Sequence, residues 1–281
     1  MTRLPLACLA GLLMVLAAGA PAQAQQAKGP TEEELAAAEA RVREYLKKLG
    51  ATDQVRVAPI ADESVARLFP RFTCVAVLFP QYPLARIAPD PLKASNVIAV
   101  PKGEGRPQPL SDAKELETFF KDNAPAVSSR TDTELVRAWL RLAEELSQDG
   151  FYKFKEPSEF KGEGTKSDDG KSERIQKVGG KVEVDPQGGN KGEIRATIEF
   201  DKDGKIAKID HKADLKPGPR PICQATKLLD PDPIVRRMAE DSIRVMGSAA
   251  RSYLDEQRAK ASPELQKAID QIWQRILDEG R

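Results

Sequence analysis

The residues that most often perform acid–base or nucleophilic chemistry are scarce in this chain. His211 is the only histidine among 281 residues. A serine or cysteine nucleophile that needs an imidazole base would therefore have to use this side chain. His211 falls on the apolar side of an alternating run, which favours a histidine packed in the core over a catalytic base. We keep His211 as a residue that could line a pocket.

Cysteine chemistry is equally restricted. Of three cysteines, only two follow the N-terminal apolar segment. Cys74 lies in an apolar run and Cys223 in a proline-rich run, and neither has a nearby base or cation that would make it a reactive thiolate. In an oxidising compartment Cys74 and Cys223 could form a disulfide, and two separate buried thiols are the alternative. One histidine and two distant cysteines do not build a zinc site without carboxylates.

Carboxylates are abundant, but their spacing selects no catalytic pair among the 43 Asp and Glu residues. The run 201–204 (Asp-Lys-Asp-Gly) is typical of a hairpin turn, because it lacks the closing glutamate of an EF-hand. The glycine pairs 179–180 and 188–189 indicate turns and do not match a phosphate-binding motif. The sequence therefore predicts no catalytic residue, no cofactor and no metal.

One loop has the residue types of a recognition site. Residues 80–91 contain four prolines between two apolar runs, so this segment cannot donate a full ladder of hydrogen bonds. Tyr82 and Arg86 in this loop could contact a partner, because binding residues are frequent on loops. A stiff connector is the alternative interpretation.

The N-terminus predicts export. Arg3 precedes an apolar run at 4–18, and Ala22-Gln23-Ala24 is a small-x-small cleavage site. These features are typical of a signal peptide at residues 1–24, with an uncleaved anchor as the alternative. We expect a secreted or periplasmic protein of about 257 residues, with no integral membrane segment after cleavage.

The charge of the exported chain argues against nucleic-acid binding. The signal peptide contains one charged residue, Arg3, and its removal leaves 43 basic against 43 acidic residues. Nucleic-acid binding needs a clustered basic surface. We therefore expect no nucleic-acid partner.

Residues 25–219 are predicted to form an α+β body. Thr31, Asp112 and Thr131 each precede a glutamate by three residues and open a helix. The nearly continuous apolar run 72–79 indicates a strand buried on both faces, and 96–100 a second strand. These helices are expected to pack on antiparallel sheet.

The middle of the body changes character. From about 151 to 216, short runs alternate apolar and charged residues, which predicts an antiparallel sheet with one packed face and one wet face. The segment 162–172 is polar and rich in glycine and lysine, and we expect it to be a loop.

Residues 220–281 predict a stack of short helices. Asp232 is an N-cap candidate with Pro233 in the first helical position, and Gly247 follows as a stop. Ser262 and a following proline open the last helix. Met238 falls at the helical spacing of the apolar residues, so we expect it to be buried.

The start Asp-Pro-Asp-Pro-Ile-Val-Arg-Arg at 230–237, the stop at Gly247 and the helix entry at Ala249-Ala250 resemble a HEAT-like repeat. This resemblance covers about Cys223–Leu277. The whole chain also resembles uncharacterised secreted bacterial proteins that end in such a segment. HEAT-like repeats are interaction scaffolds, so the resemblance implies a protein partner that binds the C-terminal helices. The alternative is a helical lid that completes the core.

The leading hypothesis is an exported, non-enzymatic binding or scaffold protein of the bacterial envelope that binds a protein partner. The missing catalytic set and the repeat-like helices favour it. A carboxylate-dependent hydrolase is one alternative. The other is a small-ligand carrier with a pocket between the sheet and the helices, near His211.

Overall fold

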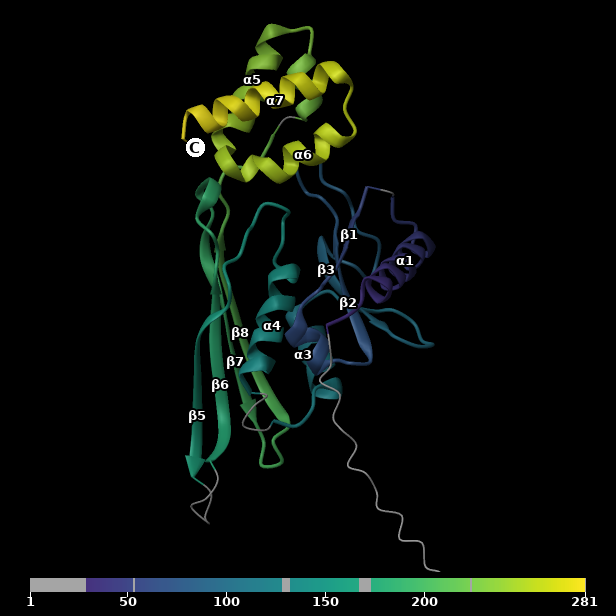
Figure 1. Cartoon of the computed structure of the whole chain (residues 1–281), viewed down its shortest axis with the longest axis vertical. Helices are drawn as coiled ribbons and strands as arrows, with labels where there is room; N and C mark the ends of the chain where they lie inside the picture. Colours follow the sequence, from purple (N-terminus) through teal and green to yellow (C-terminus); the bar gives the residue numbers. More distant parts are fainter. Residues whose placement is uncertain (1–28, 53, 128–131, 167–172, 223, 281) are drawn as a thin grey trace, which may run out of the picture.

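The fold combines two antiparallel four-stranded sheets with helices, as a computed structural model shows for residues 29–52, 54–127, 132–166, 173–222 and 224–280 (Figure 1). The predicted α+β class, with helices packed on antiparallel sheets and a helical C-terminus, is confirmed. The expected signal peptide at 1–24 lies outside the described residues. No helix in the described ranges is both long enough and apolar enough to cross a bilayer.

The two central strands of the first sheet are buried on both faces. The strands of this sheet, in spatial order, are β1 (Arg56–Pro59), β2 (Phe72–Leu78), β3 (Ser95–Pro101) and β4 (Gln108–Leu110). In β2 the neighbours Cys74 and Val75 point to opposite faces, yet their exposed fractions are only 2% and 0%. The helix α1 (Glu32–Lys48) covers one face with Val42 and Leu46. Burial on both faces explains why the run 72–79 is almost continuously apolar.

The second sheet is long and has one packed face. Its strands, in spatial order, are β5 (Ser158–Lys166), β6 (Glu173–Glu183), β7 (Lys191–Phe200) and β8 (Ile206–Lys216). The hairpin predicted at 201–204 joins β7 to β8, with Gly204 at φ 73°. Our expectation of a loop at 162–172 is wrong for 162–166, because pairing with β6 satisfies the backbone there whatever the side chains are. Residues 167–172 lie outside the described ranges.

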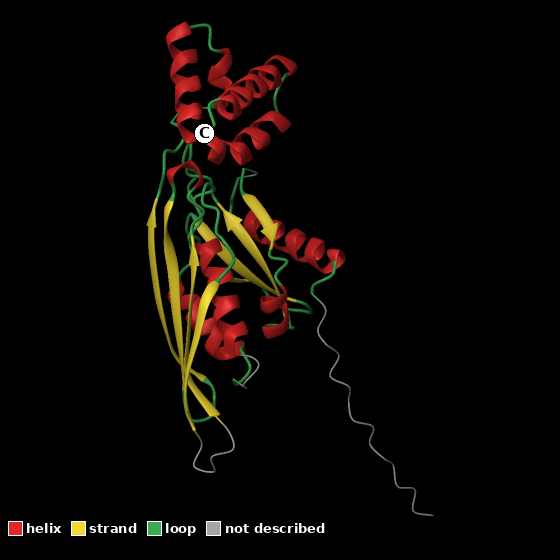
Figure 2. Cartoon of the chain, turned by 60° about the vertical axis from the view of Figure 1, so that its left-hand side comes forward, coloured by secondary structure: helices red, strands yellow, loops and turns green. Residues whose placement is uncertain are grey.

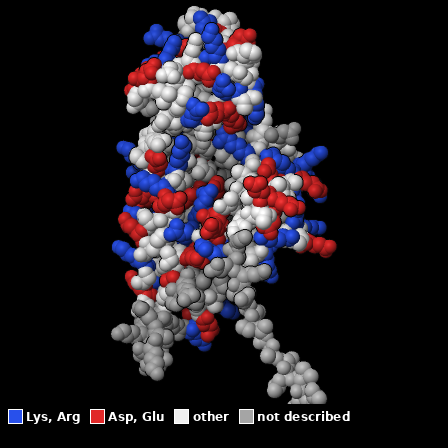
Figure 3. All heavy atoms as spheres, viewed as in Figure 1, with Lys and Arg blue, Asp and Glu red and all other residues white. Residues whose placement is uncertain are grey.

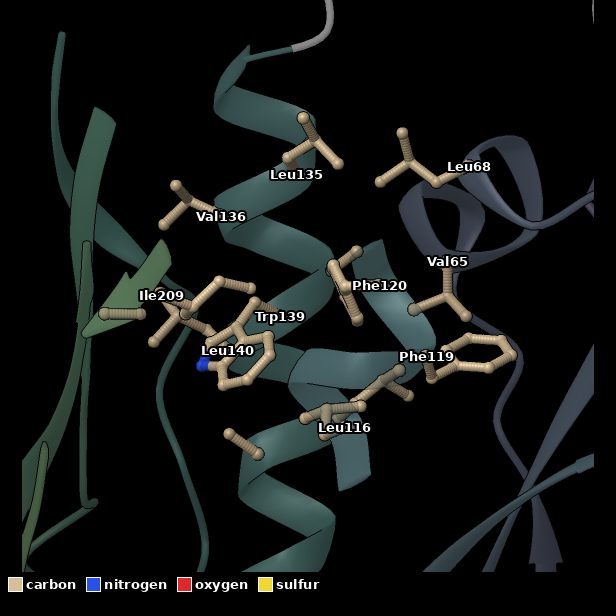
Figure 4. Packing of buried hydrophobic residues seen from close by; sticks show 14 of the residues in the cluster. Val65, Leu68, Leu116, Phe119, Phe120, Leu135, Val136, Trp139, Leu140 and Ile209 are labelled. Atoms are coloured by element: carbon tan, nitrogen blue, oxygen red, sulfur yellow. The ribbon is translucent and has the colours of Figure 1, made fainter. Parts of the chain in front are cut away.

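Helices lie between the two sheets and contact both (Figure 1), and Figure 4 shows their apolar side chains packed together. These helices are α2 (Glu63–Leu68), α3 (Ala113–Asn123) and α4 (Asp132–Leu146). Trp139 of α4 is 1% exposed and packs edge-on against Phe120 of α3, with 5.1 Å between ring centroids. One continuous core therefore joins α4 to residues of both sheets, such as Val97 and Ile194.

The C-terminal helices form a second core at one end of the molecule (Figures 1 and 2). The elements are η2 (Ala225–Leu229), α5 (Pro233–Met246), η3 (Gly247–Ala250), α6 (Arg251–Ala259) and α7 (Pro263–Asp278). The predicted caps are present, since Asp232 accepts a hydrogen bond from the N–H of Ile234 and Ser262 accepts one from Leu265.

The stack is joined to the body through Phe151. This ring comes from the body segment after α4, yet it is 5% exposed and packs in the core of the C-terminal helices. The side-chain amide of Asn190 holds Phe151 by donating to its carbonyl at 3.0 Å. A short helix, η1 (Gln187–Gly189), packs against η3. The stack is therefore seated on the body through apolar contacts.

Candidate functional site

A cleft of about 590 Å³ lies where the body meets the C-terminal helices. One wall comes from β1 and from the proline-rich loop, and includes Arg56, Tyr82 and Arg86. The opposite wall is α6 and the residue that follows it, with Glu256 and Lys260. The loop with the residue types of a recognition site and one of the C-terminal helices, α6, therefore line the same cleft.

The proline-rich loop is closed by its own hydrogen bonds. The amide of Gln81 donates to the carbonyl of Phe79 at 2.8 Å and to that of Arg86 at 3.2 Å. The N–H of Arg86 donates to the carbonyl of Pro80 at 2.8 Å. These bonds fix the backbone on both sides of Tyr82, so the loop presents Tyr82 and Arg86 in a defined geometry.

A row of aromatic rings crosses the junction beneath the cleft. The ring of Tyr82 lies edge-on to Phe151 at 6.1 Å, and Phe151 lies 6.3 Å from the ring of Tyr253 on α6. Tyr82 is 40% exposed, whereas Tyr253 is 2% exposed and its hydroxyl accepts the N–H of Ala225 at 2.8 Å. The row anchors the loop to α6 and leaves one ring accessible to a ligand.

The cleft carries more positive than negative charge. Arg56 donates through Nε to Glu256 at 2.9 Å, and Lys260 lies 3.8 Å from the other oxygen of the same carboxylate. Among the described residues, the guanidinium of Arg86 has no carboxylate partner. Among the described residues that line the cleft, Glu256 is the one acid beside four cations, and one of these cations, Arg43, pairs with Glu39 at 2.7 Å. Figure 3 shows blue side chains at the step between the stack and the N-terminal sheet.

His211 lies away from this cleft. It is part of β8 and its Nδ1 accepts a hydrogen bond of 3.3 Å from the indole Nε1 of Trp139. Burial lowers the pKa of His211, so the neutral ring that this bond requires is favoured. His211 does not line the hollow at α1 or the hollows over the outer face of β5–β7 either. The role of His211 as a pocket residue stays a prediction.

Cys74 is a residue of β2, and its side chain is buried in the core. Burial raises the pKa of its thiol, in the reduced form, to about 12, so it is a poor nucleophile at neutral pH. Cys223 lies outside the described residues. The disulfide between Cys74 and Cys223 stays a prediction.

Glu144 on α4 is a buried acid whose pKa is raised. Its exposed fraction is 5%, and burial raises its pKa to about 7 against the opposing effect of Arg141. Arg141 donates to Oε2 of Glu144 at 2.9 Å, while Oε1 is buried without a hydrogen-bond partner. Arg141 also pairs with Glu145 at 2.8 Å. Glu144 does not line the cleft, and across the described ranges no three His, Cys, Asp or Glu side chains gather as a metal-binding group.

Sequence reasoning missed Arg56, Glu256 and Lys260. Arg56 and Glu256 are 200 positions apart, and nothing in the spacing of either residue indicates the other. Only the four-residue spacing of Glu256 and Lys260 on a helix is visible in the sequence, and it indicates a surface pair.

Comparison of the whole chain with protein-family models, with curated proteins and with solved structures found no match.

Proposed function

We propose that this chain is an exported, non-enzymatic binding protein of the bacterial envelope, and that it holds an acidic, extended segment of a partner protein in the cleft between body and stack. The observation that supports this most strongly is the composition of the cleft walls. The recognition loop provides Tyr82 and Arg86, and Lys260 directly follows α6. Among the described lining residues one carboxylate, Glu256, faces four cations, of which Arg43 is paired with Glu39 outside the lining. Export is proposed from the signal-peptide pattern at residues 1–24.

Arg86 is the residue that most directly selects an acidic ligand. A guanidinium presents a planar fork of N–H donors that binds a carboxylate through two parallel hydrogen bonds. Within the described residues Arg86 has no such partner, and its loop is already fixed by hydrogen bonds to Pro80 and Gln81. Binding would therefore order few additional groups, which favours affinity.

A second carboxylate of the ligand fits beside Arg56 and Lys260. These two cations share Glu256, so together they have one negative charge to neutralise them. An incoming carboxylate gains from the excess charge without displacing Glu256. The partly exposed Tyr82 and Leu84 add apolar contact at the rim, which suits a peptide better than an inorganic anion.

The resemblance of the C-terminal helices to HEAT-like repeats is part of the same proposal. Such repeats commonly bind extended segments of partner proteins along a helical surface. Here one helix, α6, provides that surface and the body provides the opposing wall.

The test is a titration of the mature chain with a fluorescently labelled acidic peptide, followed by anisotropy. Matched peptides in which glutamine or lysine replaces each glutamate are the chemical controls. We expect the acidic peptide to bind, and its affinity to fall as salt is added. Arg86→Gln removes one charged hydrogen-bonding group and is expected to weaken binding about tenfold.

Arg71→Gln is the matched protein control, because Arg71 is an exposed arginine of the body that does not line the cleft. This variant is expected to bind like the unmodified chain. Equal affinity for the acidic and glutamine peptides, or an Arg86→Gln variant with unchanged affinity, would refute the proposal.

A further inference from the structure

The helix α5 presents apolar side chains on two opposite sides. Ala239, Ile243 and Met246 are fully buried in the core of the stack. On the other side, Ile234 and Met238 are 69% and 52% exposed. Our expectation that Met238 is buried is wrong. The buried side of α5, centred on Ile243, faces α7, and Met238 lies on the exposed side.

The exposed side of α5 continues beyond Met238. Val245, seven residues further along, is 55% exposed, and spacings of four and seven residues place Ile234, Met238 and Val245 on one helix face. Ile222 extends this face sideways, since its N–H donates to Ser242 Oγ at 3.2 Å while its side chain is 74% exposed. We call these four residues the α5 stripe. Exposed apolar residues gathered on one helix face in this way are typical of an interaction surface.

The charges beside the stripe are self-complementary. Arg237 and Asp241 lie on the same face, with exposed side-chain fractions of 84% and 55% and 3.9 Å between them. Asp241 also accepts a hydrogen bond of 3.2 Å from Arg244 of the same helix. Such an open pair within one helix contributes little by itself. When two α5 helices are placed antiparallel about a two-fold axis near residues 239 and 240, Ile234 of one copy faces Val245 of the other. The same placement brings Arg237 of each copy next to Asp241 of the other.

We propose that the α5 stripe is the contact surface for a second copy of this chain, with the two α5 helices antiparallel. An isologous contact needs one patch that complements itself, and both the apolar residues and the charge pair of α5 satisfy this condition. The proposal is independent of the peptide cleft, which is lined by α6 and not by α5. A dimer built in this way would carry two such clefts.

The first experiment measures the mass of the mature chain by analytical ultracentrifugation over a wide range of concentrations. We expect a dimer that dissociates on dilution. Ile234→Glu and Val245→Glu place charges in the apolar contact and are expected to give monomers. Leu277→Glu is the control, because Leu277 is a similarly exposed apolar residue of α7, at 51%, and this variant is expected to remain dimeric.

A charge-exchange experiment tests the antiparallel geometry itself. Arg237→Glu alone sets two acids against each other, and Asp241→Arg alone sets two arginines against each other, so each variant is expected to dimerise more weakly. An equimolar mixture is expected to recover dimer, because each mixed pair then joins opposite charges at both positions. Circular dichroism spectra verify that every variant is folded.

The proposal is overturned by an unmodified chain that is monomeric at every concentration. It is also overturned by a dimer that survives Val245→Glu. Failure of the mixture to recover dimer would exclude the antiparallel arrangement. None of these results bears on peptide binding in the cleft, so the two proposals fail separately.

Discussion

Replacement of Glu144 by glutamine should change how the stability of the fold depends on pH. Glu144 is 5% exposed on α4, and burial, opposed by the guanidinium of Arg141, raises its pKa from 4.5 to about 7. Between these two values the folded chain keeps a proton that the unfolded chain has lost. The free energy of unfolding therefore falls as the pH rises through this interval.

The size of the effect follows from the shift. Each pKa unit corresponds to 1.36 kcal/mol, so a change from 4.5 to about 7 is worth roughly 3 kcal/mol when complete. Glutamine has the shape of the protonated acid and does not ionise. Relative to the unmodified chain, Glu144→Gln should therefore gain about 2–3 kcal/mol of stability between about pH 5 and about pH 8.

The assay is urea unfolding followed by circular dichroism at several pH values, with the difference between the two proteins plotted against pH. The lowered pKa of His211 has the opposite effect to the raised pKa of Glu144, because it makes both proteins less stable as the pH falls below 6.5, the pKa of an unfolded histidine. This effect is the same in both proteins and cancels in the difference. Glu44→Gln is the control, because the pKa of Glu44 is lowered by Lys48 and it stays ionised in this range. A difference that does not change with pH would refute the assignment of Glu144 as a buried, neutral acid.

Three further substitutions test how the stack is built and seated, each measured by urea unfolding. Gly188→Ala should destabilise the fold by about 1–3 kcal/mol more than Gly50→Ala. Both glycines have a positive φ, but a Cβ at position 188 would lie 2.2 Å from the Cβ of Ala249, whereas a Cβ at position 50 would have no atom within 4 Å. Equal costs for the two substitutions would contradict this. Phe151→Ala should cost about 3–5 kcal/mol and also weaken peptide binding, since the ring that supports Tyr82 is lost. Asp232→Ala should cost about 1 kcal/mol by removing the N-cap of α5, and no loss would show that the cap is not needed.

Local signals in the sequence predicted most helix boundaries. Thr31 and Asp112 cap α1 and α3 with the predicted hydrogen bonds, and Gly247 ends α5 at φ 57°. These features depend on a few adjacent residues, so they are readable without knowledge of the tertiary structure. The burial of β2 on both faces was likewise visible in its apolar run.

Features that depend on distant partners were not predictable. The strand β5 has a polar, glycine-rich sequence, and its backbone is ordered by pairing with β6. Met238 lies at a spacing that suits burial, but the rotation of α5 in the stack is set by packing against α7. The cleft also depends on residues that are distant in the sequence. Tyr82 and Arg86 could be identified as part of a candidate recognition loop, but Lys260 in the opposing wall comes from the other end of the chain.

The central claim is that the loop at 80–86 and the helix α6 act together as one binding site. Hydrogen exchange measured by mass spectrometry, with and without a saturating acidic peptide, tests it most directly. We predict slower exchange in both segments at once, at Tyr82–Arg86 and at Arg251–Lys260, with no change at Gln108–Asn123. Binding that slows exchange in only one wall, or only along α5, would contradict the account.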